Sequence, residues 1–204
     1  MADDRIDDVL SYWFGGGAGA EAAMPERLRR WFRGGPEVDR EIRERFGGDL
    51  ERARRGELDA WADTPRGRLA LVILLDQFSR NLHRGTGEAF AGDSQALELA
   101  VEGLDRGVDS AFDPFERMFF TLPLSHAEDL ASQERAVRTC EAWAASLPPA
   151  LVGMAKSALD QARLHRDVIA RFGRFPTRNQ ALGRTSTPEE SAHVEAAKAA
   201  GHPV

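Results

Sequence analysis

Apolar residues recur along the chain at the three- and four-residue spacing that places side chains on one face of a helix. Such stripes cover residues 6–14, 38–50 and 97–104. The first stripe is followed by GGGAGAEAA, a stretch that should end its helix. No run alternates apolar and polar residues over the length that a strand needs. The pattern therefore predicts helices from one end of the chain to the other.

Capping residues and prolines indicate where several of these helices begin. Residues 113–116, 125–128 and 187–190 each carry Asp, Ser or Thr three positions before Glu, which is the spacing of a capping box. Each of the three segments predicts the start of a helix. Thr64-Pro65 predicts a further start, and Pro148-Pro149 predicts the start of a long helix that ends at a glycine.

Helices joined by short turns favour a layout of stacked helix pairs. We expect a single all-α domain over residues 1–204, with about eight to ten helices packed as antiparallel helix pairs. Residues 196–204 are expected to form a tail. A fixed period of about 34 residues would mark tetratricopeptide repeats, and the chain has no such period. The predicted architecture is a tetratricopeptide-like (TPR-like) array without a clear sequence repeat.

Two histidines occupy positions where helical phase demands a buried side chain. His165 shares a face with Ala162 and Ile169 in the long helix. In the helix expected after residue 125, His126 is in phase with Leu130, which places it in the first turn. A helix N-terminus favours a neutral imidazole that can accept a proton. A core histidine hydrogen-bonded to the backbone explains His165 equally well.

The helix expected after Thr64-Pro65 changes from apolar to polar residues halfway along. It is apolar on all sides as far as residue 75 and then carries Asp76, Gln77, Arg80 and Asn81. Asp76 precedes Arg80 by four residues, the favourable order for an ion pair on a helix. The helix either enters a polar cavity or emerges into solvent, and the ion pair is equally compatible with a purely structural role.

The stretch RFGRFPTRN at residues 171–179 combines arginines with aromatic residues. Between residues 163 and 184 there are six arginines and one acid, Asp167. We expect Phe172 and Phe175 to anchor the loop, which would hold its arginines over a site for a carboxylate or phosphate. The expected ligand-binding residues are Gln77, Arg80, Asn81, Arg171, Arg174, Arg178 and Asn179.

The candidate catalytic residues are two imidazoles and two carboxylates. His126 or His165 would transfer the proton, and Asp76 or Glu128 would orient the ring. Membership of a capping box is an alternative explanation of Glu128. Hydrolytic and lyase-type reactions both remain open, as does the absence of catalysis.

A metal site is a further alternative, built from the two histidines with Glu128 or Asp129. The chain lacks the His-x-x-x-His spacing that places two ligands on one helical face. We therefore expect no metal and no other cofactor.

Composition narrows the class of partner. The formal net charge is −6 and the pI is near 5.5, which argues against nucleic acid or an anionic membrane as a partner. The longest apolar run, at residues 69–75, is too short to span a bilayer. The single cysteine, Cys140, allows no internal disulfide, which agrees with a soluble cytoplasmic protein.

Only Lys156 and Lys198 among the 27 basic residues are lysine, an arginine bias that a GC-rich genome also explains. The sequence leaves the oligomeric state undetermined.

Four motifs of the chain resemble those of the bacterial domain of unknown function 924 family: LSYWFG, TPRGRLALVILLDQFSRNLHRGTGEAFAGD, ERMFFTLPLSHAEDL and HRDVIARFGRFPTRNQALGRTSTPEE. The resemblance covers roughly residues 6–195. It implies an all-α array of helix pairs in the TPR-like superfamily, and no established activity. Its motif positions are Asp76, Gln77, Arg80, Asn81, His126, Glu128, Asp129, His165, Arg171, Arg174, Arg178 and Asn179. The chain departs from the family at Ser79, where the resemblance implies proline, and at Thr177, where it implies histidine.

Two functions of different class follow from these observations. The first is binding of a small anionic molecule in a polar pocket, with or without proton transfer. The alternative is an interaction module whose Arg/Asn-lined groove binds an acidic peptide. A closed cavity in which the polar residues converge would favour the first function, and an open groove would favour the second.

Overall fold

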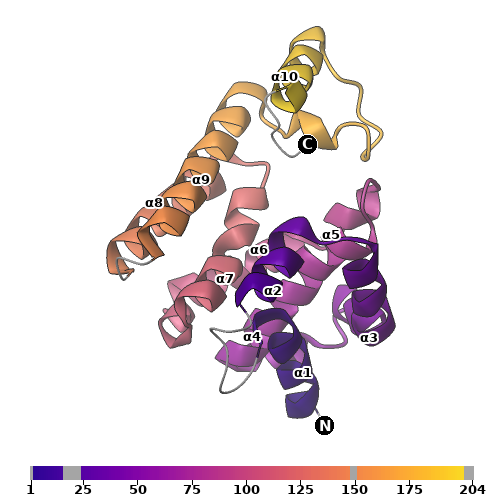
Figure 1. Ribbon diagram of the computed structural model, residues 1–204, viewed down its shortest axis with the longest axis vertical. Helices are drawn as coiled ribbons and strands as arrows, with labels where there is room; N and C mark the ends of the chain where they lie inside the picture. The colour runs from indigo at the N-terminus through magenta and orange to yellow at the C-terminus, as the bar shows by residue number, and fades with distance from the viewer. Residues whose placement is uncertain (1, 16–23, 148–150, 200–204) are drawn as a thin grey trace. The chain divides into compact units, whose positions relative to one another are not determined.

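The computed structural model describes residues 2–15, 24–147 and 151–199 (Figure 1). These residues form helices and no strand, which confirms the all-α prediction. The α-helices are α1 (Ala2–Phe14), α2 (Met24–Leu28), α3 (Pro36–Arg54), α4 (Pro65–Val72), α5 (Ser79–Leu82), α6 (Asp93–Asp105), α7 (Pro114–His126), α8 (Leu130–Ser146), α9 (Val152–Phe172) and α10 (Pro188–Ala199). Most of the GGGAGAEAA stretch and the predicted start at Pro148-Pro149 lie outside the described residues.

Shorter helical segments join these helices. Residues Arg29–Arg33 and Ile73–Phe78 are π-helical. Four 3-10 turns are Asp59–Asp63, Gly87–Phe90, Val108–Ala111 and Pro176–Arg178. None of the described helices is both long enough and apolar enough to cross a lipid bilayer.

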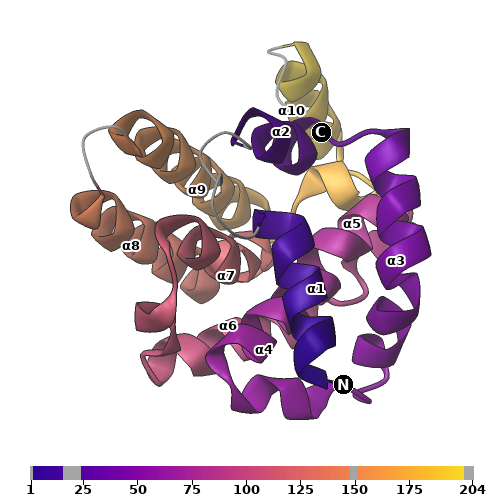
Figure 2. The same ribbon diagram turned by 60° about the horizontal axis from the view of Figure 1, so that its bottom comes forward.

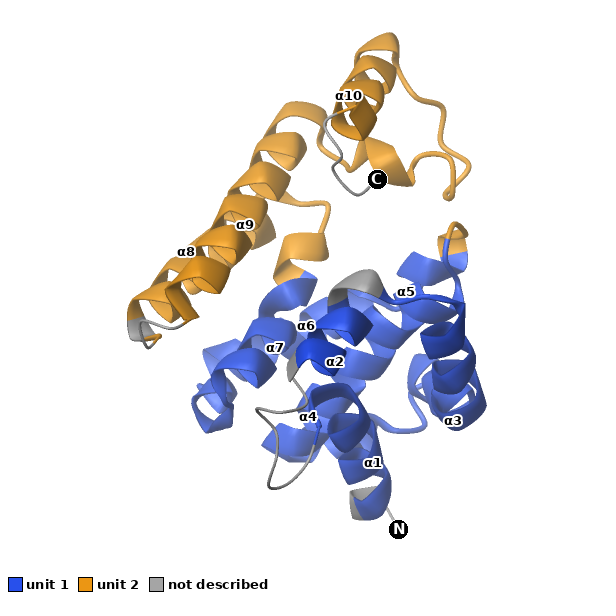
Figure 3. Cartoon of the chain, viewed as in Figure 1, with its two compact units in different colours: residues 1–84, 88–123 blue, residues 85–87, 124–204 orange. Residues whose placement is uncertain are grey.

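The chain divides into two compact units, which Figure 3 distinguishes by colour. Unit 1 comprises residues 1–84 and 88–123, and unit 2 comprises residues 85–87 and 124–204. The boundary falls within α7, after Pro123. The single domain expected over residues 1–204 stays a prediction. Of the expected tail, residues 196–199 belong to α10.

Unit 1 is built around a cluster of aromatic side chains. Trp13 of α1 and Phe46 of α3 are at most 1% exposed. The ring of Phe78 lies 5.5 Å from Trp13 and 5.1 Å from Phe46, distances typical of stabilising aromatic pairs. Trp13 also meets Phe119 of α7 edge to face at 5.5 Å. The apolar stripes at residues 6–14 and 38–50 face this core, as their helical phase predicts.

The helical stretch that begins at Pro65 is unbroken as far as Leu82 but changes its hydrogen-bonding pattern. The π-helical segment Ile73–Phe78 separates α4 from α5. Residues 69–75 are all buried, so this run is apolar on every side, as expected. Gly92 lies so close to it that a Cβ at that position would sit 2.5 Å from the carbonyl oxygen of Leu75. A glycine is required there because the backbones touch.

Two glycine substitutions in unit 1 should change stability in opposite directions. Gly92→Ala pushes a methyl group into the Leu75 carbonyl and should lower the free energy of unfolding by about 1–3 kcal/mol. Gly48→Ala lies within α3, where a Cβ meets nothing within 4 Å, and should raise it by about 1 kcal/mol. Urea unfolding followed by circular dichroism measures both, and an equal effect of the two changes would contradict the packing described.

Unit 2 consists of the helix pair α8 and α9, followed by a loop and α10. Figure 2 shows α8 and α9 side by side, and they pack along their length. This pair confirms the expectation of packed helix pairs. Gly173 ends α9 in the left-handed conformation with φ of 69°, as its place after the apolar stripe predicts. The loop returns through the turn Pro176–Arg178, which packs against α10.

Candidate functional site

The residues singled out from the sequence belong to two different units. Unit 1 contains Asp76, Gln77, Arg80 and Asn81. The members in unit 2 are His126, Glu128, His165, Arg171, Arg174, Arg178 and Asn179. His126, His165 and Arg174 all belong to unit 2, and the network of Asp76, Gln77, Arg80 and Asn81 lies within unit 1.

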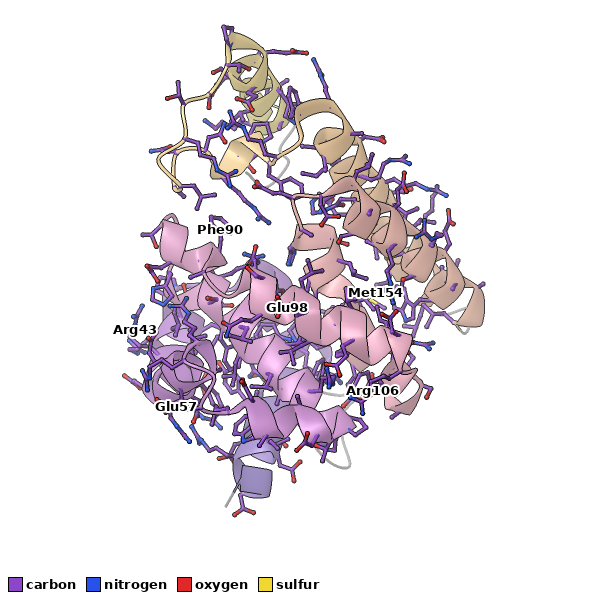
Figure 4. All side chains as sticks on the ribbon, turned by 180° about the vertical axis from the view of Figure 1, so that it is seen from behind. Arg43, Glu57, Phe90, Glu98, Arg106 and Met154 are labelled. Carbon is purple, nitrogen blue, oxygen red and sulfur yellow. The ribbon has the colours of Figure 1, made fainter. Side chains whose placement is uncertain are left out.

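Asp76 and Arg80 form the ion pair that their spacing predicts. Nη2 of Arg80 lies 3.1 Å from Oδ1 of Asp76 and 3.0 Å from Oδ1 of Asp93. Gln77 donates to the other oxygen of Asp76 at 2.5 Å. The Arg80 guanidinium also lies over the ring of Phe90, 5.3 Å from its centroid; Phe90 is labelled in Figure 4. The Arg80 guanidinium therefore pairs with two carboxylates and also lies over an aromatic ring.

The polar half of this helix does not emerge into solvent. Asp76 and Ser79 are 0% exposed. The Ser79 hydroxyl accepts a hydrogen bond from Arg54 at 2.6 Å, an interaction that the proline implied by the family resemblance could not make. Asn81 donates to Asp39 at 2.8 Å. These side chains therefore bind polar groups of their own unit, which is the structural role left open by the sequence.

Removal of Arg80 should lower the free energy of unfolding, because a buried carboxylate such as that of Asp76 is unfavourable without a paired cation. Arg80→Ala leaves Asp76 without its cation in the core of unit 1, and unfolding should become easier by about 3–5 kcal/mol. Arg84→Ala is the control, because its side chain is 54% exposed and an exposed pair contributes at most about 1 kcal/mol. Urea denaturation of both variants tests this, and a loss of equal size would show that burial of Asp76 carries no penalty.

His126 does not begin a helix, so that prediction was wrong. It is the last residue of α7, and α8 begins at Leu130 with Asp129 as its N-cap. The Asp129 carboxylate accepts from the Ser132 backbone N–H at 2.8 Å. The phase argument that aligned His126 with Leu130 fails because the two residues belong to different helices, and Leu130 is 43% exposed. The argument from a helix N-terminus therefore does not apply to this ring.

Glu128 does not form a capping box with Ser125, which lies within α7. Its Oε1 accepts from the backbone N–H of Phe175 at 2.9 Å, and its Oε2 lies 2.8 Å from Nη2 of Arg184. Burial acts to raise the pKa of Glu128, but these hydrogen bonds and the Arg184 charge outweigh it and hold the pKa below its ordinary value. Glu128 ties the connection between α7 and α8 to the loop after α9.

His165 lies on the inward face of α9, as predicted, and both ring nitrogens have partners. Nδ1 lies 3.0 Å from the carbonyl oxygen of Ser125. A carbonyl oxygen only accepts, so Nδ1 carries the proton. In the neutral ring Nε2 is then an acceptor, 2.8 Å from the amide nitrogen of Gln161. The ring also meets Phe175 edge to face at 5.2 Å. A backbone carbonyl therefore orients His165 at Nδ1.

Arg174 and Glu190 form the central ion pair of the loop. Nε and Nη2 of Arg174 donate to the two carboxylate oxygens at 2.7 and 2.9 Å. Glu190 also accepts from the Thr187 backbone N–H at 2.8 Å, while the Thr187 hydroxyl accepts from the Glu190 N–H at 3.1 Å. This pair of bonds confirms the predicted capping box. Asn179, which is 1% exposed, adds a contact to Glu190 at 3.3 Å.

The other arginines of this region also bind groups of their own chain. Arg178 donates to the His126 carbonyl oxygen at 2.9 Å and lies over the Phe175 ring. Arg171 lies 2.5 Å from a Glu189 oxygen. The remaining ion pairs are Arg163 with Glu141, Arg166 with Asp167, and Arg184 with Glu128. Carboxylates from other segments of unit 2 thus offset the arginine excess that the sequence shows locally.

The bonds to Glu190 should make stability depend on pH in acid. The hydrogen bond from Arg174 and, after it, the hydrogen bond from the Thr187 N–H lower the pKa of Glu190 to about 2. A carboxyl whose folded pKa is depressed contributes stability above its ordinary pKa of about 4.3, and this is lost as pH falls toward 2. Glu190→Gln should flatten the fall in melting temperature between about pH 5 and 2. Glu189→Gln is the control, with a side chain 64% exposed, and it should leave the fall unchanged; a parallel loss in both would contradict this assignment.

A cavity of about 300 Å³ lies between α9, the loop and α10. Its polar lining consists of Gln161, His165, Thr177 and His193, and Phe175 contributes to its apolar wall. Position 177 is where the family resemblance implies a further histidine. We name this space the α9–α10 cavity.

His193 was not among the residues predicted from the sequence. It follows the buried Glu190 by three positions, so both lie on one face of α10. The three-residue spacing from Glu190 to His193 is visible in the sequence and could have identified His193. The His193 ring lies 5.0 Å from the ring of Phe172, which is half-buried at the end of α9.

Neither metal binding nor thiol chemistry is indicated by the geometry. Over the part of the chain that the structure describes, no three His, Cys, Asp or Glu side chains are placed to hold a metal ion. Burial raises the pKa of the Cys140 thiol to about 11, which keeps it protonated and unreactive.

Comparisons with known proteins agree with the resemblance found in the motifs. The family model described as a bacterial protein of unknown function (DUF924) matches residues 9–198. A solved structure of a protein of unknown function, ATU0120 from Agrobacterium tumefaciens, is similar with a TM-score of 0.78 and 37% sequence identity. The alignment covers 96% of this chain and 99% of that one. Among proteins with curated descriptions, none matches the chain.

Proposed function

We propose that this chain, which belongs to the DUF924 family of bacterial proteins of unknown function, binds a small organic acid in the α9–α10 cavity. One observation carries the proposal: imidazoles from two helices, His165 and His193, line the same cavity of about 300 Å³. That volume suits a small molecule. The mixed lining suits a ligand with an apolar body and one acidic group.

The imidazoles are better placed than the arginines to receive the acidic group. Arg174 already holds Glu190 through two hydrogen bonds, and Arg171 holds Glu189. Among the described residues that line the cavity, none is Arg, Lys, Asp or Glu. A protonated imidazole would therefore provide the positive charge for a bound carboxylate, and the Thr177 hydroxyl offers a further donor.

The orientation of His165 also supports proton transfer. The Ser125 carbonyl holds the Nδ1–H tautomer, so Nε2 is the basic atom of the ring. Gln161 donates to that atom at 2.8 Å, and a bound molecule that displaced this amide could give its proton to Nε2. Such a step is compatible with hydrolytic or lyase-type chemistry.

A TPR-like interaction module remains the alternative, with Arg174 and Asn179 lining a groove for an acidic peptide. It has less support, because the side chains of both residues bind Glu190. A peptide carboxylate would have to displace a carboxylate that is only 3% exposed.

Isothermal titration calorimetry with hexanoate and its neutral analogue hexanamide tests the proposal. Hexanoate should bind saturably and hexanamide about tenfold or more weakly, because a charge-assisted hydrogen bond contributes about 1.5–3 kcal/mol. Hexanoate should bind more tightly as pH falls, because a protonated imidazole carries the positive charge that pairs with the carboxylate.

Three histidine variants make the test specific. His193→Asn and His165→Asn should each weaken hexanoate about tenfold or more, whereas His126→Asn should not, because His126 does not line the cavity. Equal binding of the acid and the amide, or equal binding by all three variants, would refute the proposal. Saturable binding of an acidic peptide that is lost in Arg174→Ala would favour the interaction module.

A further inference from the structure

A second pocket, in unit 1, gathers three arginines around the only tyrosine of the chain. Its volume is about 330 Å³, and helices α1, α2 and α3 and the segment that follows α2 all contribute to it. The charged and aromatic residues that line it are Tyr12, Glu26, Arg27, Arg30, Glu41 and Arg45. We call it the Tyr12 pocket.

Two guanidinium groups lie against the Tyr12 ring. The central carbons of Arg30 and Arg45 are 4.3 and 4.8 Å from the ring centroid. Tyr12 is 5% exposed, and its ring packs against that of Phe46 in a tilted contact at 5.2 Å. Stacking occupies the flat faces of the guanidiniums, whereas their N–H groups point outward in the plane. The ring therefore stabilises two cations, and Nη1 of Arg30 also donates to the carbonyl oxygen of Tyr12.

The third guanidinium, that of Arg27, is part of a built site. Arg27 is only 6% exposed, and it lies over the rings of Trp31 and Phe115 at 5.1 and 5.4 Å. Burial lowers its pKa, and the charges of Asp113 and Glu116 act in the opposite direction. An anion in the pocket would likewise stabilise the charged form of Arg27.

The glutamates of the pocket bind its arginines only loosely. Glu26 is 63% exposed and approaches Arg30 at 3.5 Å, and Glu41 is 48% exposed and approaches Arg45 at 3.5 Å. Charge-assisted hydrogen bonds are ordinarily 2.7–2.9 Å long, and exposed pairs of this kind contribute at most about 1 kcal/mol. A ligand oxyanion could therefore take the place of either glutamate. Glu41 would retain the hydrogen bond from the Tyr12 hydroxyl, which is 3.1 Å long.

We propose that the Tyr12 pocket binds the phosphoryl group of a small molecule. Among the described residues that line the pocket, three guanidiniums against two carboxylates leave one positive charge in excess. The three arginines come from α2, from the segment that follows it and from α3, so more than one guanidinium can share a dianion, which attracts them more strongly than a monoanionic carboxylate does. Arginine forks are a common means of binding phosphate. The site is independent of the α9–α10 cavity, since it uses residues of unit 1 alone.

The single tyrosine provides a direct test. Protein labelled with carbon-13 in the tyrosine ring gives one set of ring resonances, which report on this pocket. Inorganic phosphate is titrated at constant ionic strength, with acetate as the monoanionic comparison. The Tyr12 signals should shift saturably with phosphate and at least about tenfold less tightly with acetate. The histidine variants of unit 2 should leave this response unchanged.

Two arginines of α3 provide a matched pair of variants. Arg45→Gln removes a guanidinium that contacts Tyr12, whereas Arg52→Gln removes one with similar exposure, 48% against 45%, outside the pocket. Arg45→Gln should raise the dissociation constant for phosphate about tenfold or more, and Arg52→Gln less than about twofold. If Arg45→Gln proves unstable, Arg45→Lys, which keeps the charge and loses the fork, should also weaken binding. Linear, non-saturable shifts, or equal affinities in the Arg45 and Arg52 variants, would overturn the proposal.

Discussion

The ion pair between Arg174 and Glu190 holds the loop of unit 2 against α10. Glu190 is 3% exposed, so its charge requires partners, and Arg174, Asn179 and the Thr187 N–H supply them. The turn Pro176–Arg178 lies between the two arms of this network. Its position relative to α9 and α10 sets the α9–α10 cavity, and without the ion pair the loop would lose its anchor on α10. The geometry of the proposed ligand site therefore depends on a structural carboxylate that the cavity does not contain.

Unit 1 accommodates its arginines in two ways. Arg80 uses its N–H groups to serve the carboxylates of Asp76 and Asp93, which satisfies the requirement that buried charges be paired. Arg30 and Arg45 lie over the Tyr12 ring and pair only loosely with Glu26 and Glu41. Guanidinium suits both environments because it is planar and weakly hydrated, and an ammonium group would fit neither as well. An arginine bias of genomic origin is thus compatible with an acidic protein, and its effect depends on what each arginine contacts.

Local patterns in the sequence predict much of the fold and less of the site. The stripe at residues 6–14 and the box at residues 187–190 rest on neighbours three or four positions apart, and both appear as expected. The same spacing at residues 125–128 misleads because α7 continues through Ser125 and Asp129 caps the next helix. The partners of the arginines lie 16 positions away for Arg174 and 56 for Arg184. Helical period contains no information about such pairs, so an excess of charge in one segment overstates the charge available to a ligand.

The two proposed sites would respond differently to their surroundings because their cations differ. Imidazole is the side-chain group whose charge can depend on pH near neutrality, so the affinity of the α9–α10 cavity for an acid would depend on protonation. The guanidiniums of the Tyr12 pocket stay charged throughout that range, and selection there depends on the number and direction of donors. The Tyr12 pocket would thus select a phosphoryl group by the geometry of its donors. The α9–α10 cavity would select an apolar carboxylic acid by the protonation of its imidazoles. Within the cavity, Thr177 stands where the family resemblance implies a histidine, so the proposed binding of an acid would depend on the imidazoles of His165 and His193.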